Sequence, residues 1–228
     1  FLVAAPHSGS GKTTITLGIL RGLANRGVRV APAKAGPDFI DPAFHAAATG
    51  RECVNLDPWA MRAELVTMLA NEAASSADLL IVEGMMGLFD GASDRRGSSA
   101  DLAVQLGLPV VLVIDCAKQS QSVAALVEGF VRHREDVVIA GLILNRVGSD
   151  RHEAILRAAL GDSGVPILGV VHRKDALELP SRHLGLVQAG EHAALELFLE
   201  AAARHIAESV DLEALTSLGE LSANSGDN

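Results

Sequence analysis

Apolar residues along this chain fall in short uninterrupted runs that alternate with longer amphipathic segments. Six runs are expected strands, and they cover Leu2–Ala5, Val28–Ala33, Leu79–Val82, Val110–Ile114, Val137–Leu144 and Ile167–Val171. Because these runs carry Val, Ile and Leu continuously rather than at every second position, they are typical of strands buried on both faces. The pattern therefore predicts an α/β fold, a mostly parallel sheet with helices on both faces.

The segments between the runs carry apolar residues at helical spacing. They cover Thr13–Asn25, Trp59–Ala74, Ser122–Arg134, Arg151–Leu160 and Glu191–Glu208. After them, residues 217–228 turn to Ser, Gly, Asn and acidic residues, a composition typical of a linker. We therefore expect one domain over residues 1–208, followed by a helix and linker over residues 209–228. Ligands of such sheets bind beyond the carboxyl ends of the strands, so those ends are where functional residues are expected.

The most specific motif joins the first expected strand to the first expected helix. It reads P-H-S-G-S-G-K-T-T over residues 6–14 and matches the phosphate-binding loop G-x-x-x-x-G-K-[ST] except at its first position, where Pro6 stands. Backbone N–H groups of such a loop bind phosphate, its lysine reaches the β- and γ-phosphates, and its threonine hydroxyl binds Mg²⁺. An ordinary glycine-serine turn before a helix is the alternative. The residues predicted to bind nucleotide here are Ser8, Gly9, Ser10, Gly11, Lys12, Thr13 and Thr14.

A cation and two carboxylates follow the second expected strand, in the stretch K-A-G-P-D-F-I-D-P that begins at Lys34. If this strand neighbours the first, Lys34, Asp38 and Asp41 emerge beside the phosphate loop. The alternative is a set of solvated loop charges. Since Mg²⁺ prefers oxygen ligands, both aspartates are candidate metal ligands.

The third expected strand ends on a carboxylate, Glu83, in the stretch E-G-M-M-G-L-F-D-G. An ionised carboxylate at the end of an apolar strand needs a metal or another partner, as a Walker B acid does. Glu83 is therefore the best further metal ligand. The three glycines that follow it permit a tight loop, which would hold Asp90.

Asn145 and Arg146 end the fifth expected strand. The two-sided amide of Asn145 can match the edge of an adenine, and we predict that both residues bind nucleotide. An equally good reading is that Asn145 caps a loop. Asp115, which follows the fourth expected strand, is a weaker candidate.

The net charge bears on the kind of partner this protein binds, and the cysteine content bears on its redox compartment. The net charge is −9 and no run of Lys or Arg occurs, which argues against a nucleic-acid partner. The two cysteines, Cys53 and Cys116, lack C-x-x-C spacing, which indicates free thiols in a reducing compartment.

No apolar run reaches the roughly 18 residues that cross a bilayer, and the first residues lack the charged start of a signal peptide. We expect a cytoplasmic protein without a membrane partner.

Four segments in order resemble the cobyrinic acid a,c-diamide synthases, including the hydrogenobyrinic acid branch of vitamin B12 synthesis. They are the phosphate loop, the two stretches quoted above, and L-P-S-R-H-L-G-L at residues 179–186. The resemblance implies a dethiobiotin-synthetase-like P-loop fold that uses ATP and Mg²⁺ to phosphorylate the a and c carboxylates of a corrinoid, after which ammonia displaces phosphate. It implies catalytic roles for Lys12, Lys34 and Glu83. It implies Mg²⁺ ligation by Thr13, Asp41 and Glu83, with Asp38 nearby. It places Asp38, Phe39, Ile40, Asp90, Arg182 and His183 against the corrinoid. An equally good reading of Arg182 and His183 is a role in helix packing.

Members of that family continue into a glutaminase domain, which supplies the ammonia. Neither Cys53 nor Cys116 lies in the tight glycine-flanked turn typical of its nucleophile, so residues 209–228 are expected to lead toward such a domain of the full-length protein. Alternatives with the same fold are a nickel-sirohydrochlorin a,c-diamide synthase and a cobyric acid synthase. A nucleotide-switch ATPase of the ParA and MinD kind is an alternative of another class, and it is disfavoured because His7 stands where those proteins carry a signature lysine. The sequence leaves the assembly open, a homodimer included.

Overall fold

A computed structural model describes residues 1–94, 96–173 and 193–224. Its centre is one seven-stranded sheet in the order β3-β2-β4-β1-β5-β6-β7, and every neighbouring pair of strands is parallel. The strands are β1 (Leu2–Ala4), β2 (Val30–Ala35), β3 (Val54–Leu56), β4 (Leu79–Glu83), β5 (Val110–Asp115), β6 (Ile139–Val147) and β7 (Ile167–His172). The predicted parallel α/β fold is confirmed.

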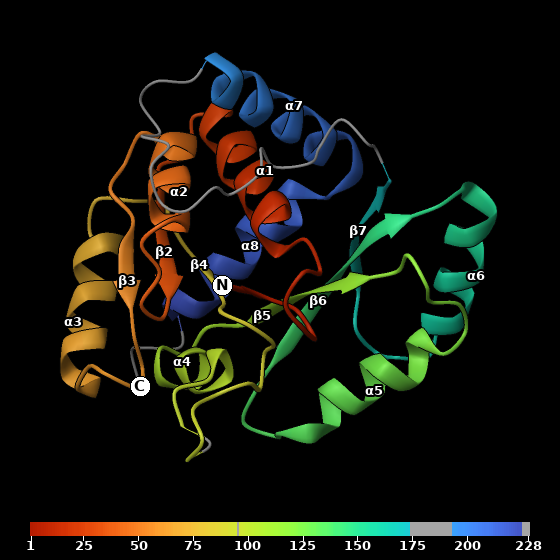
Figure 1. Cartoon of the computed structure of the whole chain (residues 1–228), viewed down its shortest axis with the longest axis horizontal. Helices are drawn as coiled ribbons and strands as arrows, with labels where there is room; N and C mark the ends of the chain where they lie inside the picture. The colour runs from red at the N-terminus through yellow and green to blue at the C-terminus, as the bar shows by residue number, and fades with distance from the viewer. Residues whose placement is uncertain (95, 174–192, 225–228) are drawn as a thin grey trace.

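Helices cover both faces of the sheet, as Figure 1 shows. They are α1 (Lys12–Asn25), α2 (Asp41–Thr49), α3 (Ala63–Ala74), α4 (Ser99–Gln105), α5 (Val123–His133), α6 (Asp150–Leu160), α7 (Ala193–Ser209) and α8 (Leu212–Asn224). Successive residues of β1 point to opposite faces, so Leu2 packs in the cluster under α3 to α6, while Val3 packs in the cluster under α1, α2, α7 and α8. The sheet is thus buried on both sides, as its continuous apolar strands predict.

Three elements, β3, α2 and α4, were not expected from the sequence, and the helix expected after residue 208 is longer than predicted. Strand β3 has three residues at the edge of the sheet, and α4 has seven residues, so neither is long enough to show a clear period. Helix α2 has nine residues, and its Asp, Pro and His among alanines do not form a clear apolar stripe. Helix α8 replaces most of the linker predicted over residues 217–228, because Leu212 and Leu215 are buried against the core and the helix continues to Asn224.

The first two strands of the chain are not neighbours in the sheet, yet Lys34, Asp38 and Asp41 still line a cleft beside the phosphate loop. Strand β4 lies between β1 and β2, because the chain crosses over from β2 through α2, β3 and α3 before β4 inserts at the centre. Lys34 on β2 is instead paired in register with Glu83 on β4. Among the described residues, no helix has the length and apolarity to cross a membrane.

We expect Gly18→Ala to destabilise the protein by about 1–3 kcal/mol, although alanine favours helices. A β-carbon at Gly18 of α1 would collide with Ile206 Cγ1 of α7 and lie 3.0 Å from the carbonyl oxygen of Ala202. Gly129→Ala in α5 is the matched control, since a β-carbon there meets nothing within 4 Å and should stabilise by up to about 1 kcal/mol. Chemical denaturation of both variants measures the difference, and equal shifts would contradict close packing of α1 on α7.

Candidate active site

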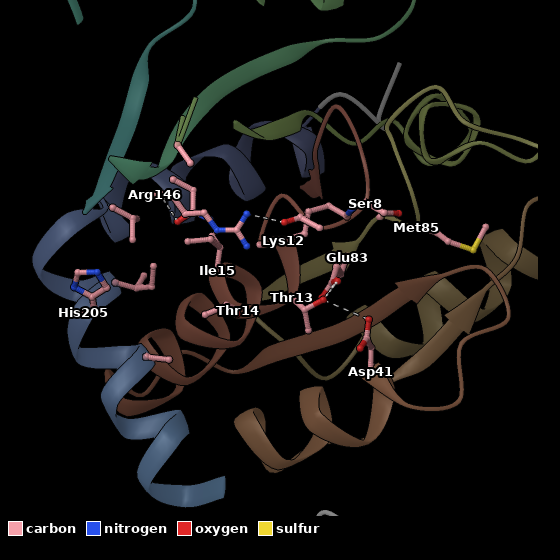
Figure 2. A pocket seen from close by; sticks show the side chains of 18 of the residues that line it. Ser8, Lys12, Thr13, Thr14, Ile15, Asp41, Glu83, Met85, Arg146 and His205 are labelled. Carbon is pink, nitrogen blue, oxygen red and sulfur yellow. Dashed lines mark hydrogen bonds between the residues drawn. The ribbon is translucent and has the colours of Figure 1, made fainter. Parts of the chain in front are cut away.

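A cleft of about 840 Å³ lies over the carboxyl ends of the strands (Figure 2). The phosphate loop and the start of α1 form its floor, and the ends of β2, β4, β6 and β7 and one side of α7 form its walls. Its polar lining includes Ser8, Gly9, Gly11, Lys12, Thr13, Thr14, Lys34, Asp38, Asp41, Glu83, Asn145, Arg146, His172, Arg173 and His205. The topology therefore gathers most of the residues that the sequence singled out into one cavity.

The phosphate loop turns sharply into α1. Gly9 and Gly11 adopt φ values of 81° and 88°, which residues with a β-carbon rarely adopt. Helix α1 begins at Lys12, directly after the second of these glycines. A helix N-terminus with adjoining loop N–H groups is a ready binding site for a phosphate group.

Two carboxylates, a hydroxyl and an ammonium meet behind this loop. Thr13 Oγ1 lies 2.7 Å from Glu83 Oε1 and 3.5 Å from Asp41 Oδ2. Lys34 Nζ donates to the same two oxygens, at 2.9 Å from Glu83 Oε1 and 2.7 Å from Asp41 Oδ2. Figure 2 shows Thr13, Glu83 and Asp41 pointing toward one another from α1, β4 and α2. Asp38 is further away, with Oδ2 3.8 Å from Lys34 Nζ.

Burial and neighbouring charges shift the pKa values of Glu83 and Lys34 in opposite directions. Burial alone would raise the pKa of Glu83, but the charge of Lys34 and a hydrogen bond from His45 outweigh it and hold that pKa below its ordinary value. Burial alone would lower the pKa of Lys34, but Glu83 and Asp41 outweigh it and raise that pKa. Near neutral pH Glu83 is therefore held as an anion and Lys34 as a cation.

Lys12 is in a different electrostatic position. Its Nζ donates to the carbonyl oxygen of Met86 at 2.6 Å, a neutral acceptor. Burial lowers the pKa of Lys12, and the carboxylates around it offset that effect only in part. Met86 itself adopts a φ of 51°, which brings the backbone of the loop after β4 close to the phosphate loop. Among the residues that the structure describes, no carboxylate forms an ion pair with Lys12, and its side chain lines the cleft, where it could neutralise an anion.

Of the residues predicted to face a corrinoid, one lines the cleft, three do not, and two lie outside the described residues. Asp38 lines the cleft, and its Oδ1 accepts from the N–H groups of Ile40 and Asp41, which shapes the start of α2. Phe39 is 90% exposed, and Phe39, Ile40 and Asp90 are not among the residues that line the cleft. Asp90 accepts from the N–H of Gly87 and so holds its own loop. Two further predicted residues, Arg182 and His183, lie outside the described residues.

Four residues at or behind the cleft were missed from the sequence, and His45 is the one that lies behind its lining. His45 is fully buried and lies 2.7 Å from Glu83, and its spacing of four residues from Asp41 on one helix was an available signal. His172, Arg173 and His205 line the far end of the cleft, at the end of β7 and on α7. No motif marks these three, because only the packing of α7 beside β7 brings them together.

Asn145 contacts the phosphate loop directly. Its Nδ2 donates to the carbonyl oxygen of Ser10 at 2.9 Å, and its Oδ1 accepts from the N–H of Arg146. Arg146 donates to the carbonyl oxygen of Gly9 at 2.8 Å and pairs with Asp115. These contacts agree with the loop-capping reading of Asn145, while a contact of either residue with a nucleotide stays a prediction.

We expect Asn145→Ala to weaken nucleotide binding about tenfold, because the loop would lose a buried hydrogen bond that holds its shape. The matched control is Gln105→Ala, which removes an amide donating to the carbonyl oxygen of Ala63 at a site remote from the cleft. Calorimetric titration with nucleotide measures both. Unchanged affinity in the Asn145 variant would show that the loop keeps its shape without this bond.

Residues 1–187 match the sequence profile of the CobQ/CobB/MinD/ParA nucleotide binding domain. The chain belongs to this family. The description of this family as a nucleotide binding domain agrees with the phosphate-binding loop that lines the cleft.

Relatives with high sequence identity carry one name. The chain is 63% identical over 219 residues to the hydrogenobyrinate a,c-diamide synthase of Brucella anthropi, a match that covers 96% of this chain and 50% of that protein. It is 61% identical over 214 residues to the hydrogenobyrinate a,c-diamide synthase of Rhizobium meliloti (94% and 50%) and 56% identical over 220 residues to that of Rhodobacter capsulatus (95% and 50%). The chain therefore spans about half the length of the curated relatives it matches.

Solved structures support the fold. Chloroplast FtsY from Physcomitrella patens superimposes with a TM-score of 0.55 at 17% identity and covers 88% of this chain and 64% of that chain. The signal recognition particle receptor FtsY from Elizabethkingia anophelis, in complex with GDP, gives a TM-score of 0.52 at 16% identity and covers 74% and 56%. At such low identity the likeness shows the P-loop NTPase fold and nothing more.

Proposed function

We propose that the chain is the ATP-dependent amidoligase domain of a hydrogenobyrinate a,c-diamide synthase. The observation that carries the proposal is the cluster of Thr13, Lys34, Asp41 and Glu83 beside an intact G-K-T phosphate loop, in a chain about 60% identical to synthases of that name. Such a domain would convert two carboxylates of the corrinoid into amides, with ATP as the source of activation. The same relatives do not favour the nickel-sirohydrochlorin, cobyric acid or nucleotide-switch alternatives.

The cluster fits a magnesium ion by the chemistry of its donors. Mg²⁺ prefers a few hard oxygen ligands together with phosphate oxygens. A carboxylate oxygen of Glu83 lies 2.7 Å from the hydroxyl oxygen of Thr13, and a carboxylate oxygen of Asp41 lies 3.5 Å from it, beside the phosphate loop. We infer that these three residues hold the ion, with Asp38 nearby. When bound, Mg²⁺ would neutralise charge on the β- and γ-phosphates.

The residues of the chain would then act mainly by position and charge. Backbone N–H groups of the phosphate loop hold the triphosphate, and Lys12 balances the negative charge that spreads over the transferring phosphoryl group. A substrate carboxylate oxygen attacks the γ-phosphorus, the bond to ADP breaks, and an acyl phosphate forms. Lys34 lies where a second cation can balance the same charge. Ammonia then attacks the acyl carbon and inorganic phosphate leaves, which yields the amide.

The substrate would approach from the open side of the cleft. Asp38 lines that cleft, and Phe39 and Ile40 follow it at the start of α2, where a 90% exposed aromatic ring can cover an apolar face of a large ring system. We propose that these residues, with Asp90, Arg182 and His183, contact the corrinoid. The remaining half of the relatives' length is proposed to contain the glutaminase domain that supplies ammonia.

The proposal is tested with this 228-residue chain alone. Given hydrogenobyrinic acid, ATP, Mg²⁺ and an ammonium salt, it should form the mono- and diamides with release of one phosphate for each amide. Mass spectrometry of the products and a phosphate assay measure both quantities. With glutamine in place of ammonium, no amide should form. Amide formation from glutamine would contradict the proposal that a separate glutaminase domain supplies the ammonia. ATP hydrolysis without amide formation from ammonium would contradict the proposed amidation reaction.

A further inference from the structure

Helix α2 carries two residues to the Glu83 carboxylate. It begins at Asp41 and presents His45 one turn later, so both side chains lie on the same face of the helix. His45 is fully buried, and its Nε2 lies 2.7 Å from Glu83 Oε2. Because an ionised carboxylate only accepts hydrogen bonds, Nε2 carries the proton of this bond.

The two oxygens of Glu83 are therefore divided between two sets of partners. Oε2 accepts from His45, while Oε1 accepts from Thr13 at 2.7 Å and from Lys34 at 2.9 Å. With Oε2 held from the side of α2, the carboxylate cannot rotate without breaking the contact with His45. Oε1 is thereby directed at the start of α1, which is the side where phosphate and a cation would bind.

A thiol completes the chain of contacts. Cys53 Sγ lies 3.6 Å from the other imidazole nitrogen of His45, Nδ1. Burial raises the pKa of Cys53 to about 12, and the nearby charge of Glu83 adds to that effect, so the thiol keeps its proton. The thiol is within hydrogen-bond distance of Nδ1, and a second acceptor, the carbonyl oxygen of Val54, lies further away at 3.9 Å. Donation to Nδ1 favours the tautomer whose proton is on Nε2, the nitrogen that faces the carboxylate. The order of contacts is thus Cys53 to His45 to Glu83.

We propose that His45, oriented by Cys53, is a positioning residue that fixes the Glu83 carboxylate for a divalent cation in the nucleotide site. This inference rests on the proposed function in one respect, the assignment of Glu83 as a metal ligand. Partners of this kind behind a metal ligand restrict its orientation, and their removal commonly costs 10- to 100-fold in metal affinity or activity, on the order of what we expect here.

The test measures cation binding rather than turnover. Mn²⁺ serves as the probe, titrated into the chain with a non-hydrolysable ATP analogue and followed by electron paramagnetic resonance. His45→Leu, which removes the donor, should weaken Mn²⁺ binding about 10- to 100-fold. His45→Gln should stay within about threefold of the unchanged protein, because its amide Nε2 occupies nearly the place of the imidazole Nε2. Binding of the analogue in the presence of a chelator should be equal in all three proteins.

Two outcomes would overturn the role of His45. One is equal loss of Mn²⁺ affinity in the Leu and Gln variants with metal-free nucleotide binding intact, which would assign the effect to packing of the ring. The other is full Mn²⁺ affinity in His45→Leu. If His45→Leu does not fold, Cys53→Ala and Cys53→Ser decide. Cys53→Ser keeps a donor and should bind Mn²⁺ more tightly than Cys53→Ala, and equal affinities would overturn the proposal.

The unchanged protein separates this inference from the proposed function. If it binds the analogue without any dependence on Mn²⁺, the metal assignment of Glu83 is wrong and the inference fails with it. If its binding depends on Mn²⁺ and the His45 variants behave like it, only the role of His45 is wrong.

Discussion

Glu83→Gln should lower the rate of amide formation by about 10²–10³-fold or more, because one charged ligand that stabilises the transferring phosphoryl group would be lost. It should also lower the free energy of unfolding by about 3–5 kcal/mol, since Lys34 would keep only one close carboxylate partner in a buried site. Product formation under saturating ammonium and chemical denaturation measure the two effects. Glu64→Gln on the exposed side of α3 is the control and should change neither quantity.

The same variant carries a pH signature. The surroundings of Glu83 hold its pKa below its ordinary value of 4.5, so its ionisation stabilises the folded protein above that pH and the stabilisation is lost as pH falls below it. Glu83→Gln removes this contribution, so its stability should fall less steeply than that of the unchanged protein in acid. Full activity, or an equally steep loss of stability in acid, would contradict the assignment of Glu83.

Lys12→Met should also lower the rate of amide formation by about 10²–10³-fold, since the phosphoryl group would lose its nearest loop cation. Unlike Glu83→Gln, Lys12→Met should not lower the stability of the folded protein. Burial lowers the pKa of Lys12, which means that the charged form is disfavoured in the folded protein. The melting temperature should therefore stay equal or rise, in contrast to the fall expected for Glu83→Gln.

Thermal unfolding together with nucleotide titration tests this contrast. Arg26→Met, at the far end of the same helix, is the control and should leave nucleotide affinity unchanged. A large loss of stability in Lys12→Met would show that the hydrogen bond from Lys12 to the carbonyl oxygen of Met86 contributes to the fold, and activity near that of the unchanged protein would remove Lys12 from the mechanism.

Lys34 and Lys12 have different partners, and this difference underlies the effects expected for Glu83→Gln and Lys12→Met. Lys34 is surrounded by anions and is retained as a cation by the fold itself, while Lys12 is held on a neutral carbonyl oxygen. The first arrangement makes the acidic cluster stable without a ligand. The second leaves the positive charge of Lys12 available beside the phosphate loop. Burying this charge without a carboxylate partner is unfavourable, and an incoming phosphate would offset that unfavourable free energy. Stability and ligand binding thus depend on different lysines.

The sequence by itself determined the architecture and most of the chemistry. Continuous apolar runs such as Val110–Ile114 are sufficient to predict a sheet buried on both faces, because strand burial depends on residues that are neighbours in the chain. The G-K-T motif likewise predicts a phosphate loop, because its three residues act through a local turn and the first turn of a helix. Glu83 could be selected since it interrupts an apolar strand at its carboxyl end.

The tertiary structure alone decided which of these groups meet. Strand order is set by crossovers between distant segments, and the insertion of β4 between β1 and β2 is what pairs Lys34 with Glu83. The burial of His45 behind Glu83 and the position of His205 beside the end of β7 depend on how α2 and α7 pack on the sheet. Local patterns carry no information on such contacts, because their free energy arises between residues 33 to 49 positions apart in the chain.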